Sequence, residues 1–118
     1  MSVKDFVQQR RDALIAMRRD FHMYPEPAWL EYRSAAKVAD TLISLGYDVA
    51  LGADVLDLDS RMGLPSDEVM KAAMDRAIEE GANPELVEKM GYGKTAIVAT
   101  MKFGGEGPVV AFRVDMDS

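Results

Sequence analysis

The chain has 118 residues, of which 48% are hydrophobic and 29% are charged, a composition typical of a soluble globular protein. Its net charge of −6 argues against nucleic acid and anionic membranes as partners, because both attract a basic surface. It contains no cysteine, which excludes disulfides, thiolate catalysis and cysteine zinc sites within this stretch.

The first predicted element is a helix over residues 3–23. Ser2 and Asp5 have the spacing of a capping box at its start, and the helix must end before Pro25 because the residue before a proline avoids the helical region. Charged residues interrupt every apolar run in this segment, so we do not expect a signal peptide, and no stretch of the chain reaches the roughly 20 apolar residues of a membrane span. The expected compartment is the cytoplasm.

A second helix is predicted over residues 30–45, followed by a strand. Gly46 stands where a left-handed residue ends a helix, and Tyr47–Leu51 then has the composition of a short strand. Such a helix–glycine–strand transition is typical of α/β folds. The apolar face of this helix is expected to comprise Ala35, Val38, Ala39, Leu42 and Leu45.

A helical insertion is expected over about 66–90. Ser66 is the predicted cap of its first helix, which ends at Gly81, and Asn83 with Pro84 begins a shorter one that stops at Gly91. The apolar positions of the first of these helices recur at intervals of three and four residues: Val69, Met70, Ala73, Met74, Ala77 and Ile78.

The last predicted elements are two strands, Thr95–Phe103 and Val109–Asp115, joined as a β-hairpin through the turn 104–108. The predicted fold class is therefore α/β, with two N-terminal helices packed on a small mixed sheet and a helical insertion between its first two strands.

The final strand ends in two carboxylates. Side chains two residues apart share one face of a strand, so Asp115 and Asp117 are expected to point the same way where the chain leaves the sheet. Catalytic groups and ligands of α/β proteins gather at the carboxyl ends of strands. Two carboxylates there suit a cation or an acid/base pair. The alternative is a polar strand end that enters a solvated turn.

Other polar features are weaker candidates. His22 is the only histidine, and we interpret it as a cap of the first helix. The acidic run 54–59 lacks the glycine and glutamate of a calcium loop, and the segment 91–95 lacks the earlier glycine of a phosphate loop. Trp29 and Tyr32 are interpreted as packing residues.

Three stretches resemble one enzyme family. Arg18–Glu26 (RRDFHMYPE) is similar to the R-R-x-[LF]-H-x-x-P-E segment near the start of metal-dependent amidohydrolases of the aminoacylase and carboxypeptidase G2 superfamily, and Phe112–Asp117 (FRVDMD) resembles their A-D-M-D strand end. Leu45–Tyr47 and Arg61–Pro65 (RMGLP) are similar to the p-aminobenzoyl-glutamate hydrolase branch.

The resemblance implies an α/β/α zinc-peptidase-like catalytic domain, of which residues 1–118 would be an incomplete N-terminal part. In the family, zinc or manganese assists cleavage of an amide bond in an N-acyl or p-aminobenzoyl amino acid. Many relatives have a metal-binding histidine at the position of Asp115, which makes this residue the candidate metal ligand. Asp117 matches the position that orients a metal-bound histidine. The remaining ligands and the general base of the family follow later in its sequence.

Two hypotheses follow. In the first, the chain is an N-terminal piece of such a hydrolase: it binds no metal by itself, is inactive alone and self-associates through exposed sheet or helix faces. Its only other expected partner is the small-molecule amide substrate of the complete enzyme. In the second, it is a stand-alone small binding or structural protein that reuses the start of the fold. The end at Asp117-Ser118 favours the first, because a self-contained domain is expected to close its sheet before a polar tail.

Overall fold

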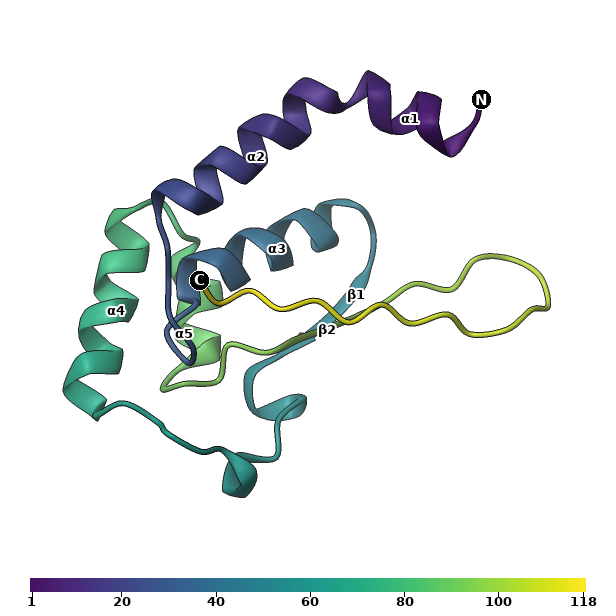
Figure 1. The fold of residues 1–118 in the computed structure, drawn as a ribbon. Helices are drawn as coiled ribbons and strands as arrows, with labels where there is room; N and C mark the ends of the chain where they lie inside the picture. The colour runs from purple at the N-terminus through teal and green to yellow at the C-terminus, as the bar shows by residue number, and fades with distance from the viewer.

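The computed structural model describes all residues, Met1–Ser118, as a mixed α/β structure with five α-helices and a two-stranded sheet (Figure 1). The α/β class predicted from the sequence is confirmed. The elements in chain order are α1 (Val3–Gln9), α2 (Arg11–Met23), α3 (Tyr32–Ser44), β1 (Asp48–Leu51), α4 (Asp67–Glu79), α5 (Pro84–Met90) and β2 (Ile97–Thr100), with short 3-10 turns η1 (Gly52–Asp54) and η2 (Leu58–Ser60) after β1.

Helix α3 is at the centre of the core, where it packs against α4, α5, β1 and β2. Its buried face is rich in alanine, whose small side chain allows neighbouring helices to approach closely. The helices predicted over 66–90 are present as α4 and α5 and supply the other half of the core. The core cluster consists of Tyr32, Ala35, Ala36, Ala39, Ala73, Ala77, Ala82, Leu86, Val87 and Met90.

The helix ends agree with the caps predicted from the sequence. Ser2 and Asp5 form the capping box of α1, Ser66 accepts from the backbone of α4, and Asn83 accepts from that of α5. Gly46 adopts a left-handed φ of 89° after α3, which a residue without a Cβ reaches at no steric cost. Each of these caps acts on backbone groups within a few residues of itself, so its effect does not depend on the tertiary fold.

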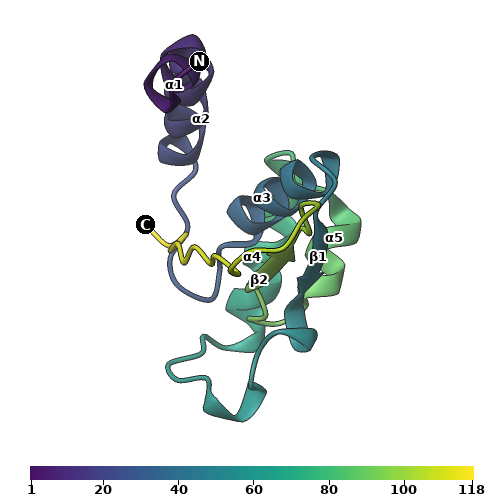
Figure 2. The ribbon, with the colours of Figure 1, turned by 90° about the vertical axis from the view of Figure 1, so that its right-hand side faces the viewer.

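The first predicted helix differs from expectation in two ways. It is divided at Arg10, whose φ of −102° and ψ of 6° lie outside the helical region. It also does not pack on the sheet: α1 and α2 contain no buried residue, and they lie away from the sheet and from α4 and α5 (Figure 2). The end of α2 is joined to α3 by polar contacts. Of the two N-terminal helical segments, only α3 packs against β1 and β2. The apolar stripe of α1 and α2 is therefore left exposed.

The predicted hairpin is wrong. Strand β2 pairs with β1 in antiparallel fashion, with Asp48 opposite Thr100 and Leu51 opposite Ile97, so the sheet is antiparallel and not mixed. We call residues 102–118 the C-terminal arm. The arm forms no strand, and its single backbone–backbone hydrogen bond is made by Ser118. The turn 104–108 opens into a wide loop instead of closing a tight hairpin (Figure 1).

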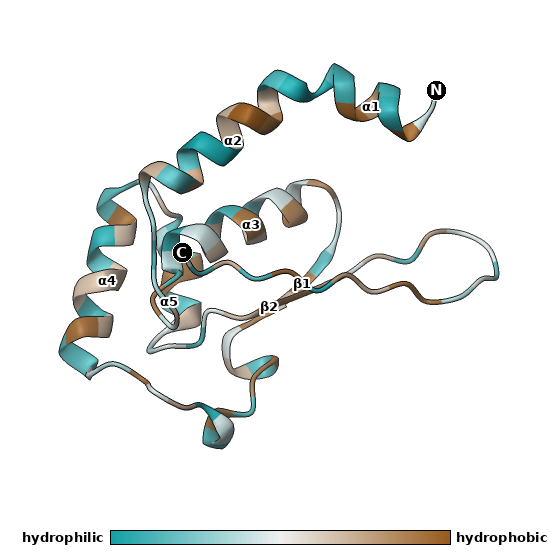
Figure 3. Ribbon diagram, in the orientation of Figure 1, coloured by the Kyte–Doolittle hydropathy of each residue, from teal (hydrophilic) through white to brown (hydrophobic).

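Packing against the core explains why β2 pairs with β1 and not with the arm. Strand β1 faces the core through Val49 and Leu51, and β2 does so through Ile97, so pairing these two strands also buries apolar area under α3. Apart from Met116, the apolar side chains of the arm cover no such surface, and Val109 and Phe112 are 98% and 91% exposed. Figure 3 shows hydrophobic residues along α1, α2 and the arm, outside the core. None of the helices has the length and apolar character needed to span a membrane.

Candidate functional site

The two candidate carboxylates lie at the end of the C-terminal arm, where it returns to the loop between α2 and α3 (Figures 1 and 2). Both aspartates are exposed, whereas Met116 between them is half-buried and packs against the core cluster. Val114, on the other side of Asp115, is 77% exposed, so Met116 is the one residue of this segment that faces the body. Asp115 accepts a hydrogen bond from Arg113 Nη2 at 3.0 Å, and no hydrogen bond is made by the side chain of Asp117.

The arm is joined to the body at Ser118. Its N–H donates to the carbonyl oxygen of Glu26 at 2.9 Å, and its Oγ accepts from the N–H of Glu26 at 3.3 Å. Residues 92 positions apart in sequence are thereby connected. The contact joins Glu26, the last residue of one stretch that carries the family resemblance, to the residue directly after the other stretch, Phe112–Asp117.

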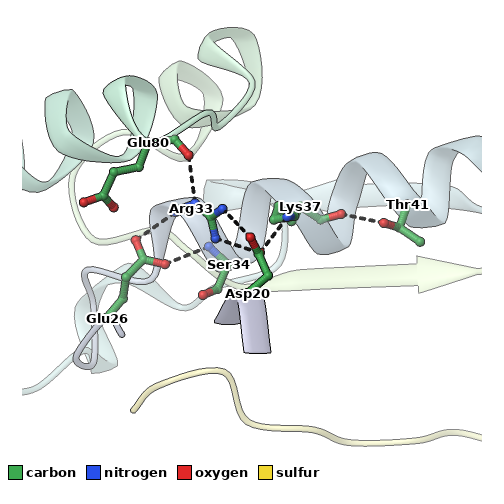
Figure 4. Close-up of polar contacts among 7 residues, drawn as sticks. All are labelled: Asp20, Glu26, Arg33, Ser34, Lys37, Thr41 and Glu80. Atoms are coloured by element: carbon green, nitrogen blue, oxygen red, sulfur yellow. Dashed lines mark hydrogen bonds and ion pairs between the residues drawn. The ribbon is translucent and has the colours of Figure 1, made fainter. Parts of the chain in front are cut away.

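Glu26 is itself held at the start of α3 (Figure 4). Only 1% of the residue is exposed, and its two carboxylate oxygens accept from the backbone N–H groups of Arg33 at 2.9 Å and Ser34 at 2.7 Å. The first N–H groups of a helix have no partner within the helix, and its N-terminus favours a negative charge. Glu26 therefore caps α3 from the preceding loop.

Asp20 connects the end of α2 to the same helix. Nη1 and Nη2 of Arg33 donate to its two oxygens at 3.0 and 2.9 Å, and Lys37 Nζ donates at 2.6 Å (Figure 4). The two hydrogen bonds from Arg33, followed by the one from Lys37, hold the pKa of Asp20 far below its usual range. The carboxylate of Asp20 in turn raises the pKa of Arg33.

Arg33 also connects α3 to α4. Its Nε donates to the carbonyl oxygen of Glu80 at 2.9 Å, and its guanidinium carbon lies 3.9 Å from the centroid of the Tyr24 ring. The side chain is only 6% exposed, so every nitrogen needs such a partner. Arg33 thus joins the end of α2, the loop before α3 and the end of α4.

A second group of contacts fixes the stretch Arg61–Pro65. Nη1 of Arg61 donates to the carbonyl oxygen of Tyr92 at 2.9 Å, and Trp29 Nε1 donates to that of Met62 at 2.8 Å. The buried hydroxyl of Tyr32 accepts from the N–H of Gly93 at 2.9 Å, and burial raises the pKa of this hydroxyl. The contacts hold the loop after β1 against the loop that leads into β2.

The donor set of this chain does not make a metal site by itself. A catalytic zinc takes three protein ligands, but no group of three or more histidine, cysteine or acidic side chains is close enough to hold an ion. Asp115 is paired with Arg113, and His22 is exposed in the last turn of α2 without a hydrogen bond to the helix end. His22 thus has the position expected of it at the helix end, without a hydrogen bond there.

Sequence reasoning did not assign the roles of Asp20, Glu26, Arg33 and Lys37. Arg33 and Lys37 are four residues apart, so both lie on one side of α3 and reach the same carboxylate. A cationic pair at this spacing, next to buried alanines, was the available signal. The packing role expected of Tyr32 is confirmed by its complete burial, while Trp29 is half-buried.

No family model matches the chain. The indole-3-acetyl-aspartic acid hydrolase of Enterobacter agglomerans is 45% identical to it over 116 residues, which are 98% of this chain and 27% of that protein. One subunit of the p-aminobenzoyl-glutamate hydrolase of Escherichia coli K12 is 44% identical over 117 residues, which are 99% of this chain and again 27% of that protein.

A solved structure also matches the fold of this chain. The aminobenzoyl-glutamate utilization protein from Klebsiella pneumoniae matches all of this chain with a TM-score of 0.94 and 46% identity, over 30% of its own length. The chain therefore spans about a quarter of the curated relatives, and its fold is that of one part of a larger protein. The resemblance inferred from the motifs is confirmed: the chain is a close homologue of part of indole-3-acetyl-aspartic acid hydrolase and of part of one p-aminobenzoyl-glutamate hydrolase subunit.

Proposed function

We propose that the chain is the N-terminal part of the catalytic domain of a metal-dependent amidohydrolase, and that the complete enzyme cleaves the amide bond of an N-acyl or p-aminobenzoyl amino acid. The observation that carries this proposal is the TM-score of 0.94, at 46% identity, to an aminobenzoyl-glutamate utilization protein. The two hydrolases at 44–45% identity support the reaction class, since the name of each describes an acyl group joined to an acidic amino acid.

In this proposal the arm carries the chain's contribution to the active site. Asp115 is a candidate metal ligand, and Asp117 orients a ligand supplied by residues outside this chain. Their exposure and shared position beside Met116 support a role in contacts beyond the chain. A bound zinc or manganese ion would supply a Lewis acid for the amide carbonyl. Two carboxylates are fewer than the three ligands such a site uses, so we propose that this chain alone is inert.

The partner of the chain is proposed from the same features. The arm and the face of α1 and α2 expose large apolar side chains, and the names of two relatives identify them as one subunit of a hydrolase or its homologue. Exposed apolar surfaces and unpaired extended segments favour association. We propose that the chain associates through these surfaces, with a second copy when no other partner is present.

The test of function uses a chimera. The matching 117 residues of the Escherichia coli protein are replaced by this chain, and hydrolysis of p-aminobenzoyl-glutamate is measured with added zinc or manganese. We expect turnover by the chimera and none by the chain alone. Asp117→Ala should abolish turnover in the chimera, and Asp12→Ala, at a side chain 97% exposed on α2, should not.

Two results would contradict the proposal. One is a folded chimera that binds metal but hydrolyses none of p-aminobenzoyl-glutamate, indole-3-acetyl-aspartate and acetylated amino acids. The other is metal-dependent turnover by the chain alone, which would show that a complete site forms within it.

A further inference from the structure

We propose that Glu26 is a positioning residue: its main chain holds the end of the arm and so sets the place of Asp117. The inference rests on the role proposed above for Asp117, and it adds a group that does not touch substrate or metal. It comes from the contacts on either side of Asp117.

The first contact is polar and follows Asp117 directly. Ser118 is bonded twice to the main chain of Glu26, through its N–H at 2.9 Å and through its Oγ at 3.3 Å. No other hydrogen bond joins the arm to the body, because its only other hydrogen bond is the local one between Arg113 and Asp115. The end of the arm therefore depends on Glu26 for its polar anchoring.

The second contact is apolar and precedes Asp117. Met116 is half-buried and packs against the core cluster, whereas the side chains of both neighbouring aspartates are exposed. Asp117 thus lies between one residue fixed by packing and one fixed by hydrogen bonds. Contacts on both sides fix the position of the Asp117 backbone and the direction in which its side chain leaves it, and precise placement of a functional group begins with a fixed backbone.

Glu26 can serve as an anchor because it does not move independently of the core. Both carboxylate oxygens bind the start of α3, and the residue is 1% exposed. Arg33, whose N–H is one of those donors, is held in turn by Asp20 and by the carbonyl oxygen of Glu80. A displacement of Glu26 would break a helix cap, so the arm is fixed to one of the most constrained points of the chain.

Glu31 provides a matched control. It is also a carboxylate at the start of α3, and it accepts a hydrogen bond from Thr95 Oγ1 at 2.7 Å, but it makes no hydrogen bond with the arm. Replacing Glu31 by alanine perturbs the same helix end without touching Ser118. Comparing Glu26→Ala with Glu31→Ala therefore distinguishes loss of the arm's anchor from a general loss of stability.

The experiment measures hydrogen exchange and chemical shifts by NMR on the whole chain. In the unchanged chain we expect the Ser118 amide to be protected. In Glu26→Ala we expect it to exchange about tenfold faster, with the Asp117 resonances moving toward unfolded values, as for any locally opened hydrogen bond. Glu31→Ala should leave both unchanged. Glu26→Gln keeps one acceptor oxygen for the two α3 amides and should restore part of the protection.

If Glu26→Ala does not fold, Ser118→Ala tests the same contact from the side of the arm. It removes only an exposed hydroxyl, and we expect faster exchange of the Glu26 amide that donates to it. A Ser118 amide that is unprotected in the unchanged chain, or whose protection survives Glu26→Ala, would overturn the proposal. These readouts need no catalysis, so loss of the role of Asp117 in the chimera would leave the anchoring result intact.

Discussion

Arg33 and Asp20 form a two-point ion pair, with Nη1 and Nη2 of the guanidinium donating to Oδ2 and Oδ1 of the carboxylate at 3.0 and 2.9 Å. Asp20 belongs to the last turns of α2, a helix without buried residues, and Arg33 to the central helix α3. The pair, together with Lys37, is the polar connection between these two helices. Its loss should therefore affect both stability and the position of α2.

The first prediction is that Asp20→Asn destabilises the chain by about 2 kcal/mol, because the 6% exposed guanidinium of Arg33 would keep its charge and lose its anionic partner. The estimate lies below the range for fully buried pairs, since Asp20 is 29% exposed. Urea unfolding followed by circular dichroism measures the effect. Asp12→Asn, at a side chain that is 97% exposed, is the control and should change the free energy of unfolding little.

The second prediction concerns pH. The pKa of Asp20 is lower in the folded chain than its ordinary value of 3.8, so near that value the unfolded chain binds more protons. Stability from this group is complete above about pH 5 and is lost progressively as pH falls through the ordinary pKa toward the lower, folded-state pKa. We expect the difference in unfolding free energy between the unchanged chain and Asp20→Asn to be constant from about pH 5 to 7 and to shrink below about pH 4. A difference that grows on acidification would contradict this.

Local signals made most of the helices predictable. Ser66 and Asn83 cap α4 and α5 where the sequence indicated, and Gly46 ends α3, because each acts on backbone groups within a few residues of itself. The break at Arg10 has no comparable signal: neither glycine nor proline is present there. The family resemblance was also readable, since it depends on residue order alone.

Contacts between distant residues were not predictable in the same way. The sequence pattern showed two apolar segments separated by a glycine-rich turn, which is equally compatible with a hairpin and with an open arm. The pairing of β2 with β1 depends on the core that α3 forms with α4 and α5. The contact of Glu26 with Ser118 uses main-chain atoms and a hydroxyl, which leave no sequence pattern.

The third prediction uses two glycines with similar backbone conformations. A Cβ at Gly93, with φ +63°, would lie 2.7 Å from Leu64 Cδ2 and 3.2 Å from Met70 Sδ, whereas one at Gly63, with φ +70°, would meet nothing within 4 Å. Gly63→Ala should cost only the strain of a left-handed residue, about 1 kcal/mol. Gly93→Ala adds overpacking and should cost about 2–4 kcal/mol in total. Equal losses in thermal or urea unfolding would contradict the contacts described around Gly93.

The fourth prediction is that Tyr32→Phe destabilises the chain by about 1–2 kcal/mol. The substitution keeps the ring in the core but leaves the buried N–H of Gly93 without its acceptor, which lies at 2.9 Å. Tyr92→Phe is the control, because this residue is 45% exposed and water can replace any bond its hydroxyl makes. Urea unfolding of both variants gives the comparison, and a neutral Tyr32→Phe would show that the hydrogen bond does not contribute.

The last prediction is that the chain self-associates through the arm. Val110 and Phe112 are 70% and 91% exposed, and the backbone around them has no hydrogen-bond partner in the chain, so an extended segment of a second copy can pair with it. The net charge of −6 opposes association only weakly at physiological salt, where charges are screened beyond roughly 8 Å. We expect a dimer or larger species in sedimentation velocity at micromolar concentration.

Two variants locate this surface. Val110→Glu with Phe112→Glu adds charge to the arm without touching the core and should shift the chain to a monomer. The second variant tests the other proposed surface, the exposed face of α1. Met1→Glu and Val3→Glu, made together behind an added initiator methionine, place the same charge on residues that are 86% and 82% exposed. This variant should leave the assembly unchanged if the arm is the interface, and a shift to monomer would place the interface on α1. An unchanged chain that is a well-folded monomer would contradict association. It would also favour the second hypothesis, a stand-alone binding or structural protein, because the arm would then need no partner to stay in solution.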